Sequence, residues 1–172
     1  RTQSWRQAGL VGWWFGLGHF TLGNNWIATA FTYQANMPAW LGWVAVVLIA
    51  CYLALFPALA ALGGWFARRN PLALALALAA RWIVTEWLRG WLFTGFAWNP
   101  LSAVLLGDPG SPGLARLLPL TGTYALSGFV VLIAGLLARL YARMIREAKR
   151  LAVRRSWLVV ATAGPVIAAL YA

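Results

Sequence analysis

Residues Thr85 to Trp98 read TEWLRGWLFTGFAW, which places an acid, a base and a cluster of aromatic residues at the end of an apolar segment. An ionisable side chain at the centre of a membrane helix costs about 2.5–3.5 kcal/mol on insertion scales, so such residues are rarely there without a function. Arg81 adds a third charge one turn before this stretch. Arg81, Glu86 and Arg89 therefore form a candidate polar site, with a role either in structure or in binding a headgroup.

The composition around this stretch is that of a membrane protein. Hydrophobic residues make up 62% of the 172 residues and charged residues only 10%, and the mean hydropathy is +0.72. Soluble domains contain about 25% charged residues. The net charge of +11 comes from basic residues that lie almost wholly between apolar segments, where they act on membrane topology. We therefore expect no nucleic-acid partner.

Five apolar stretches come close to the roughly 20 residues that cross a bilayer. The sequence predicts an all-α fold, a polytopic helical transmembrane bundle of about five spans that forms one transmembrane domain over residues 1–172. Because the last stretch stops at residue 172 and the chain begins without methionine, we expect a fragment of a larger membrane domain. The predicted spans are residues 8–31, 40–66, 72–92, 117–140 and 157–172.

The Lys and Arg residues predict the orientation, because cytoplasmic loops are enriched in them. All but three of the 14 basic residues precede the first span, lie between the second and third, or lie between the fourth and fifth. The N-terminus is therefore expected in the cytoplasm and the C-terminal end in the periplasm, in a bacterial inner membrane. The loops near Pro38 and Asp108 are then external.

The basic connector between the last two predicted spans has helical periodicity. Two interpretations are open: a topology anchor without a binding role, which we favour, or a helix that lies along an anionic leaflet. Apolar and basic residues take different faces, with Leu140, Met144, Ala148 and Leu151 on one and Arg139, Arg143, Arg146 and Arg150 on the other.

The first predicted span carries small residues at Gly9, Gly12, Gly16 and Gly23, a pattern typical of close helix packing. His19 lies among them. No second His or carboxylate stands at ligand spacing, so we interpret His19 as an interhelical hydrogen-bond partner and expect no metal site and no cofactor.

The third predicted span holds the candidate polar site. At 100° per residue Glu86 and Arg89 can pair at i, i+3, and Arg81 near the helix centre is expected to point into the bundle or a wet cavity. Two interpretations remain: a buried ion pair that fixes helix packing, or a polar socket for a lipid headgroup or peptide. The second includes interface aromatics, namely Trp82, Trp87, Trp91, Phe96 and Trp98.

No catalytic machinery is visible in this chain. The sequence has no Ser or Cys with a plausible base nearby, no carboxylate pair and no phosphate-binding glycine loop. Cys51 is the only cysteine and stands in an apolar run, which favours inert packing over reactivity.

The run from Thr85 to Trp91, followed by TGFAW at residues 94–98, closely resembles the signature of bacterial apolipoprotein N-acyltransferases. The earlier GLGHF at residues 16–20, with Asn25-Trp26-Ile27, is similar to that family's glycine-rich helix ending in a Trp-Ile pair. The order of spans agrees over nearly the whole chain. The resemblance implies a phospholipid:apolipoprotein N-acyltransferase, which passes an acyl chain from a phospholipid through a cysteine thioester to the N-terminal amine of a diacylglyceryl lipoprotein.

The resemblance also implies where the chemistry lies. The family's Glu-Lys-Cys triad belongs to a nitrilase-like domain, expected after residue 172 and absent here, so there is no catalytic residue in this chain and the isolated chain should be inactive. Phe96 and Trp98 match positions near the family's lipid entrance, although Ala97 replaces a common proline, and with Trp91 they form the expected lipid-facing site. The expected partners are a phospholipid acyl donor, a diacylglyceryl apolipoprotein acceptor and the membrane, and the protein is expected to be a monomer. The alternative is a non-catalytic membrane scaffold or transporter-like helical bundle.

Overall fold

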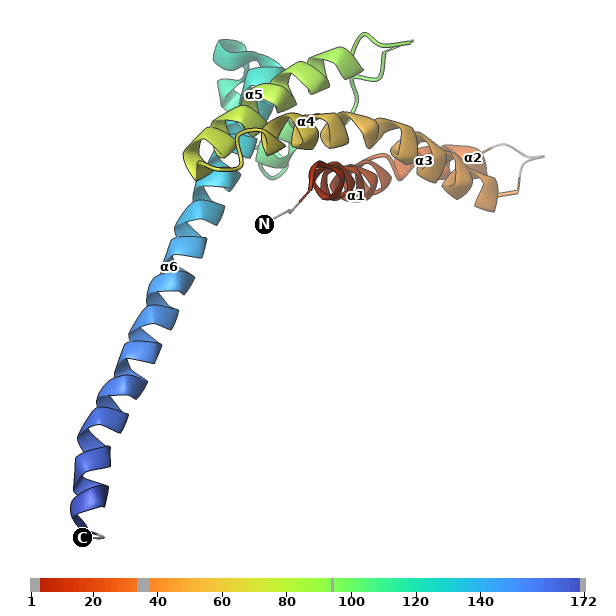
Figure 1. Cartoon of the computed structure of the whole chain (residues 1–172). Helices are drawn as coiled ribbons and strands as arrows, with labels where there is room; N and C mark the ends of the chain where they lie inside the picture. Colours follow the sequence, from red (N-terminus) through yellow and green to blue (C-terminus); the bar gives the residue numbers. More distant parts are fainter. Residues whose placement is uncertain (1–3, 34–37, 94, 171–172) are drawn as a thin grey trace. The chain divides into compact units, whose positions relative to one another are not determined.

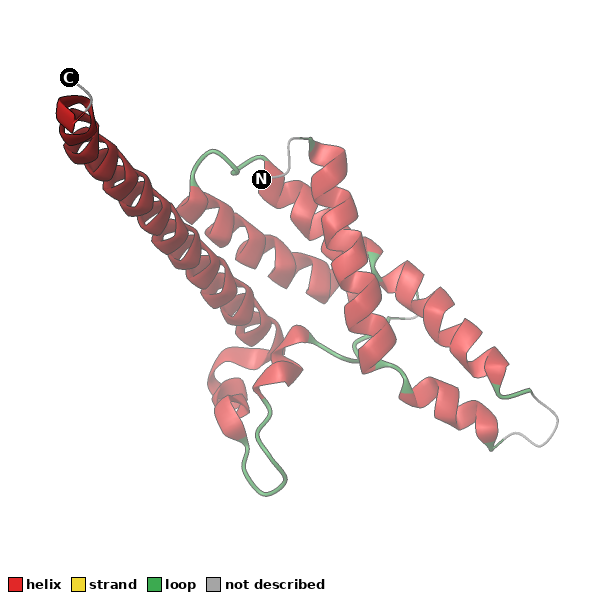
Figure 2. Cartoon of the chain, turned by 90° about the horizontal axis from the view of Figure 1, so that it is seen from below, coloured by secondary structure: helices red, strands yellow, loops and turns green. Residues whose placement is uncertain are grey.

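The computed structural model describes residues 4–33, 38–93 and 95–170, with side chains described up to Val153. All the regular structure in these residues is helical (Figure 2), which confirms the all-α prediction. The chain divides into two compact units, residues 1–135 and 136–172, and each is described by itself. Arg1, residues 34–37, Thr94 and the last two positions of the predicted fifth span lie outside the described residues.

Helix α1 (Trp5–Gly23) begins with a capping box. The Ser4 hydroxyl accepts from the Gln7 backbone N–H at 3.2 Å, and the Gln7 side chain accepts from the Ser4 N–H at 3.3 Å. The predicted first span, residues 8–31, is two helices, because α1 ends before Asn24 and α2 (Trp26–Thr32) begins after Asn25. Two consecutive asparagines, which have low helix propensity, stand at the interruption.

The predicted second span is also interrupted once. Helix α3 (Trp40–Leu53) is followed after Ala54 by α4 (Leu55–Trp65). Pro57 has no N–H to donate to the carbonyl of Leu53, four residues earlier, so the helical ladder is broken there. Ala54 itself keeps near-helical angles (φ −63°, ψ −16°), so the two helices follow one another as one apolar run.

Helix α5 (Pro71–Arg89) carries the candidate site at its C-terminal end. Asn70 caps its start by accepting from the N–H groups of Leu72 and Ala73, and proline occupies the first helical position. The predicted third span extended to residue 92, but the helix ends before Gly90. Trp91 and Leu92 therefore belong to the loop that follows.

Two short 3-10 helices, η1 (Leu101–Leu105) and η2 (Gly113–Leu117), lead into α6 (Leu118–Leu170), which is kinked at Gly122 (φ 71°). Gly128 and Gly135 of α6 lie against Ile83 and Ala75 of α5, so the start of α6 packs on α5 within the first unit. The predicted fourth and fifth spans are not separated by a break, because the backbone of α6 is helical throughout residues 136–170. The side chains of the fifth predicted span lie outside the described residues.

The glycine face of α1 packs closely on α4, as predicted (Figure 1). A Cβ atom built at Gly12 would lie 2.7 Å from the Cβ of Ala61, and one at Gly16 would lie 2.8 Å from the Cα of Ala54. Both approaches are too short for a side chain. Helix α5 also packs on α4, and α2 packs on α3.

Three helical stretches are long and apolar enough to cross a membrane in the part of the chain that the structure describes: Trp40–Trp65, Pro71–Arg89 and Gly113–Val153. The predicted number of about five is therefore not confirmed. Large apolar side chains are widely exposed on this unit, for example Leu22, Phe66 and Leu48. Such exposure is expected for surfaces that face lipid.

Candidate functional site

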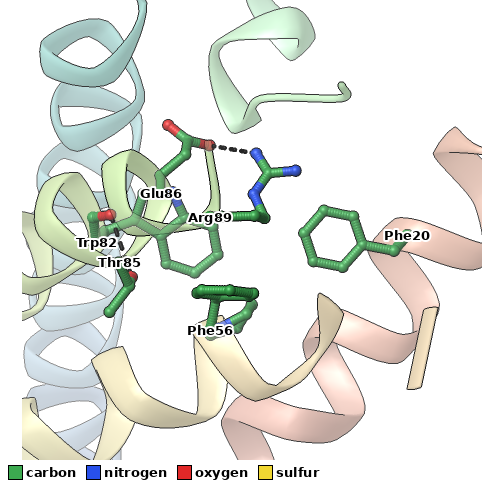
Figure 3. Close-up of a pocket in the computed structure, with 7 residues that line it drawn as sticks. Phe20, Phe56, Trp82, Thr85, Glu86 and Arg89 are labelled. Atoms are coloured by element: carbon green, nitrogen blue, oxygen red, sulfur yellow. Dashed lines mark hydrogen bonds and ion pairs between the residues drawn. The ribbon is translucent and has the colours of Figure 1, made fainter. Parts of the chain in front are cut away.

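The Glu86 and Arg89 side chains form a buried ion pair at the end of α5. Arg89 Nη2 lies 3.5 Å from Glu86 Oε1, at the predicted i, i+3 spacing, and the two side chains are only 2% and 4% exposed. Figure 3 shows the carboxylate and the guanidinium facing one another, with the Phe20 ring beside Arg89. The pairing predicted from the sequence is confirmed.

Arg89 holds the aromatic loop that follows α5, defined here as residues 91–98. Its Nη1 donates a 2.6 Å hydrogen bond to the carbonyl oxygen of Trp98, and its own carbonyl accepts from the N–H of Phe96 at 2.9 Å. The guanidinium carbon also lies 4.9 Å from the centre of the Phe20 ring, a cation–π contact with α1. One arginine thus connects the end of α5 to the loop and to α1.

Glu86 holds the next segment. Its Oε1 accepts from the backbone N–H of Leu101 at 2.9 Å, at the first residue of η1. The N–H groups at the start of a helix lack partners within the helix, so a carboxylate there satisfies one of them. Ser127 does the same for the next residue, since its hydroxyl accepts from the N–H of Ser102 at 3.0 Å. The start of η1, just after the aromatic loop, is therefore bound to α5 through Glu86 and to α6 through Ser127.

The end of α1 is bound to the same loop region by a reciprocal pair of hydrogen bonds. His19 Nε2 donates to the carbonyl of Asn99, and Asn99 Nδ2 donates to the carbonyl of His19, both at 3.3 Å. Asn99 has a φ of 52°, in the left-handed region that asparagine tolerates better than most residues. The prediction that His19 is a hydrogen-bond partner is confirmed, but its partner is a loop residue rather than another helix.

The three predicted lipid-facing aromatics differ in exposure. Trp91 and Trp98 are 71% and 65% exposed, and their rings lie 6.2 Å from Trp87 and 5.7 Å from Trp26 respectively. Phe96 is half-buried and packs on the core cluster, which comprises Phe20, Ala50, Leu53 and Phe56.

Phe96 also lines an open pocket of about 460 Å³ between the loop and α3. The Phe93 and Tyr52 rings form a T-shaped contact with centres 5.8 Å apart. Sequence reasoning missed both Tyr52 and Phe93. The aromatic character of the loop could have pointed to Phe93, but no sequence signal pointed to Tyr52. The pocket is lined by Ile49, Tyr52, Leu92, Phe93, Gly95 and Phe96.

A second, much smaller cavity lies beside the ion pair and has a volume of about 10 Å³ (Figure 3). This is the space of about one water molecule, so no substrate fits there. Its walls include the rings of Phe20, Phe56 and Trp82 with the Glu86–Arg89 pair. The ion pair is thus enclosed by packed side chains.

Arg81 departs from its prediction. It was expected to point into the bundle or a wet cavity, but it is exposed, and its side chain lies beside Gly63 of α4. A Cβ atom at Gly63 would lie 2.9 Å from Arg81 Nη1. Arg81 lies beside α4 with an exposed side chain, whereas Glu86 and Arg89 are buried. The three charges therefore do not form one site.

Cys51 is half-buried in α3 and its carbonyl oxygen accepts from Trp13 Nε1 at 3.3 Å, a contact that joins α1 to α3. Within the described residues, no group of three or more His, Cys, Asp or Glu side chains is arranged to hold a metal ion.

Comparisons with known proteins agree with the resemblance seen in the sequence. The family model described as the apolipoprotein N-acyltransferase N-terminal domain matches residues 1–136. The apolipoprotein N-acyltransferase of Ralstonia nicotianae is 41% identical over 136 residues, which is 77% of this chain and 25% of that protein. That of Pseudomonas putida is 38% identical over 169 residues, which is 94% of this chain and 30% of that protein. The chain spans less than a third of the length of these relatives.

Proposed function

Because the chain belongs to the apolipoprotein N-acyltransferase family, we propose that it is the membrane part of an enzyme that transfers an acyl chain from a phospholipid to the N-terminal amine of a diacylglyceryl lipoprotein. The observation that carries this proposal is the family match over residues 1–136, which includes the Glu86–Arg89 pair and the aromatic loop. In bacteria this reaction completes lipoprotein maturation.

The chemistry is assigned to a part of the enzyme outside this chain. In the proposed reaction a cysteine thiolate of a nitrilase-like domain, expected after residue 172, attacks the ester of the phospholipid. An acyl-thioester forms and a lysophospholipid leaves. The amine of the lipoprotein then attacks the thioester, so that an amide forms and the thiol is restored. Cys51 has no part in this scheme, because no base or carboxylate pair accompanies it.

The role proposed for this chain is to bind the acyl chains of the substrates. The pocket beside Phe96 is walled by aromatic and aliphatic side chains, which suits an acyl chain because burial of apolar surface favours binding. Trp91 and Trp98 supply exposed aromatic surface beside it, of the kind found where membranes meet water. The buried pair Glu86–Arg89 is assigned a structural role: it holds the loop that carries these residues.

The proposed setting is the bacterial inner membrane, with the protein as a monomer. With α1, the three apolar stretches would account for four of the about five predicted spans. The basic residues favour a cytoplasmic N-terminus and an external loop at residues 107–113.

The test compares the full-length protein with the chain of residues 1–172. Each is purified in detergent and given phosphatidylethanolamine with a labelled acyl chain, followed by a diacylglyceryl lipopeptide. We expect a labelled thioester and then an N-acylated lipopeptide with the full-length protein, and neither with residues 1–172. Cys51→Ala in the full-length protein serves as the control and should leave both steps unchanged.

Two results would contradict the proposal. Labelled thioester on Cys51 would place the chemistry in this chain. A folded full-length protein that forms no thioester and transfers no acyl chain would favour the alternative, a non-catalytic scaffold or a transporter-like bundle.

A further inference from the structure

The second unit of the chain carries an arginine stripe, defined here by four residues of α6. At 100° per residue the four side chains fall within about 60° of the helix circumference. Three of them are exposed and the first is half-exposed. They are Arg139, Arg143, Arg146 and Arg150.

An apolar stripe occupies the far side of the same helix, centred about 135° away from the arginines. Each of its five side chains is more than half exposed, which is unfavourable in water. Its members are Leu137 (59%), Leu140 (55%), Tyr141 (66%), Met144 (62%) and Leu151 (62%). The segment thus has a basic face and an apolar face, both uncovered.

The length of the helix places this segment at the edge of a bilayer. The apolar helical stretch Gly113–Val153 has 41 residues, about twice the roughly 20 that cross a hydrocarbon core. The uncharged run between Arg116 and Arg139 has 22 residues, about the number that crosses the core once. Residues from Arg139 onward therefore lie at or beyond the membrane surface.

We propose that residues 136–153 bind the surface of an anionic phospholipid membrane, with the arginine stripe on the lipid phosphates and the apolar stripe among the upper acyl chains. Guanidinium groups bind phosphate oxygens through paired hydrogen bonds. Helices with separate basic and apolar faces lie in this interface plane.

Charge favours this occupant over a second copy of the chain. The segment from Leu136 to Val153 contains five basic residues and one acid, Glu147. Pairing two copies along the apolar stripes would bring two such positive segments together, and like charges repel. An anionic lipid surface provides the opposite charge and an apolar layer at the same time.

The experiment measures the depth of the apolar stripe in a bilayer. The whole chain with Cys51→Ala carries a nitroxide at Leu140→Cys, or at Lys149→Cys as a reference outside both stripes. It is reconstituted into phosphatidylcholine vesicles with or without phosphatidylglycerol. We expect phosphatidylglycerol to raise the ratio of oxygen to nickel-chelate accessibility several-fold at Leu140→Cys and little at Lys149→Cys, and high salt to reverse the gain.

A scrambled variant separates the stripes from mere positive charge. The exchanges R143M with M144R and I145R with R146I keep composition, charge and the number of cytoplasmic arginines, but mix the two faces. In the scrambled variant, phosphatidylglycerol should no longer raise the ratio of oxygen to nickel-chelate accessibility at Leu140→Cys. Replacement of all four stripe arginines by lysine should retain most of that rise. Circular dichroism checks that both variants remain helical.

Three outcomes would overturn the proposal. The first is a nickel-chelate accessibility of the Leu140→Cys label that is the same in vesicles with and without phosphatidylglycerol. The second is an undiminished gain in the scrambled variant. The third is spin–spin broadening between Leu140→Cys labels, which would show a second copy on the apolar stripe.

Discussion

Arg89 donates a 2.6 Å hydrogen bond to the carbonyl oxygen of Trp98, nine residues further along the chain. The carbonyl oxygen of Arg89 also accepts from the N–H of Phe96. Both the side chain and the backbone of Arg89 therefore bind the aromatic loop. Glu86 Oε1 lies 3.5 Å from Arg89 Nη2 and also accepts from the N–H of Leu101, so one buried pair contacts the backbone at Phe96, Trp98 and Leu101.

Glu86 and Arg89 should show strong coupling in a double-mutant cycle. Removing one partner of a buried pair leaves the other charge stranded and costs about 3–5 kcal/mol, while removing both costs less. We expect Glu86→Gln and Arg89→Gln each to lower the thermal midpoint and folded yield in detergent, and the double variant to be milder than their sum. Strict additivity would show that the two side chains do not interact.

Arg89→Lys should release the loop while keeping the charge. Lysine can still neutralise Glu86, but its single ammonium group cannot also reach Trp98 in the geometry of the guanidinium. Hydrogen exchange of residues 91–98 should become faster than in the parent protein, with exchange in α1 and α4 unchanged. Equal protection of the loop in the two proteins would contradict the tethering role of Arg89.

The glycine face of α1 provides a matched comparison of packing. Gly12→Ala and Gly16→Ala place a methyl group against α4 and should destabilise by about 1–3 kcal/mol. A Cβ at Gly18 meets nothing within 4 Å, so Gly18→Ala should be neutral or stabilise by up to about 1 kcal/mol. Thermal unfolding in detergent tests both, and equal effects at the three positions would contradict the close α1–α4 contact.

Phe96→Ala and Trp98→Ala should both reduce turnover, a prediction that depends on the proposed function. Trp98→Ala should cost little expression, whereas Phe96→Ala should also lower stability because Phe96 packs on the core cluster. Trp98 is 65% exposed, so its ring contributes more to substrate contact than to stability. Trp40→Ala is the control, because Trp40 is 63% exposed but begins α3. The assay is acyl transfer by the full-length enzyme. Wild-type turnover of both loop variants in both half-reactions would remove Phe96 and Trp98 from the substrate site.

The proposed orientation can be tested with single cysteines in a Cys51→Ala background. Ser111 is exposed in the loop before η2, so Ser111→Cys should react with an impermeant thiol reagent in intact spheroplasts. Ser156→Cys, on the basic side, should react only after the membrane is opened. Reaction at Ser156→Cys and not at Ser111→Cys would reverse the orientation.

Local spacing was enough to predict the features that depend on one helix. The apolar runs predicted an all-helical membrane protein, and the i, i+3 spacing of Glu86 and Arg89 predicted their pairing, because both follow from the 3.6-residue period of the α-helix. The glycines of α1 predicted close packing, since only residues without large side chains allow two backbones to approach. The run from Thr85 to Trp98 was distinctive enough to indicate the family.

Contacts between distant segments were decided by the tertiary structure alone. Whether Arg81 points inward depends on how α4 crosses α5, and Gly63 leaves room for its side chain along the surface. His19 and Asn99 are 80 residues apart, and their pairing requires that the loop fold back onto the end of α1. The contact of Tyr52 with Phe93 at the pocket likewise requires the loop to pack on α3. Helical periodicity determines which residues share a face, but only the packing of the helices determines what each face meets.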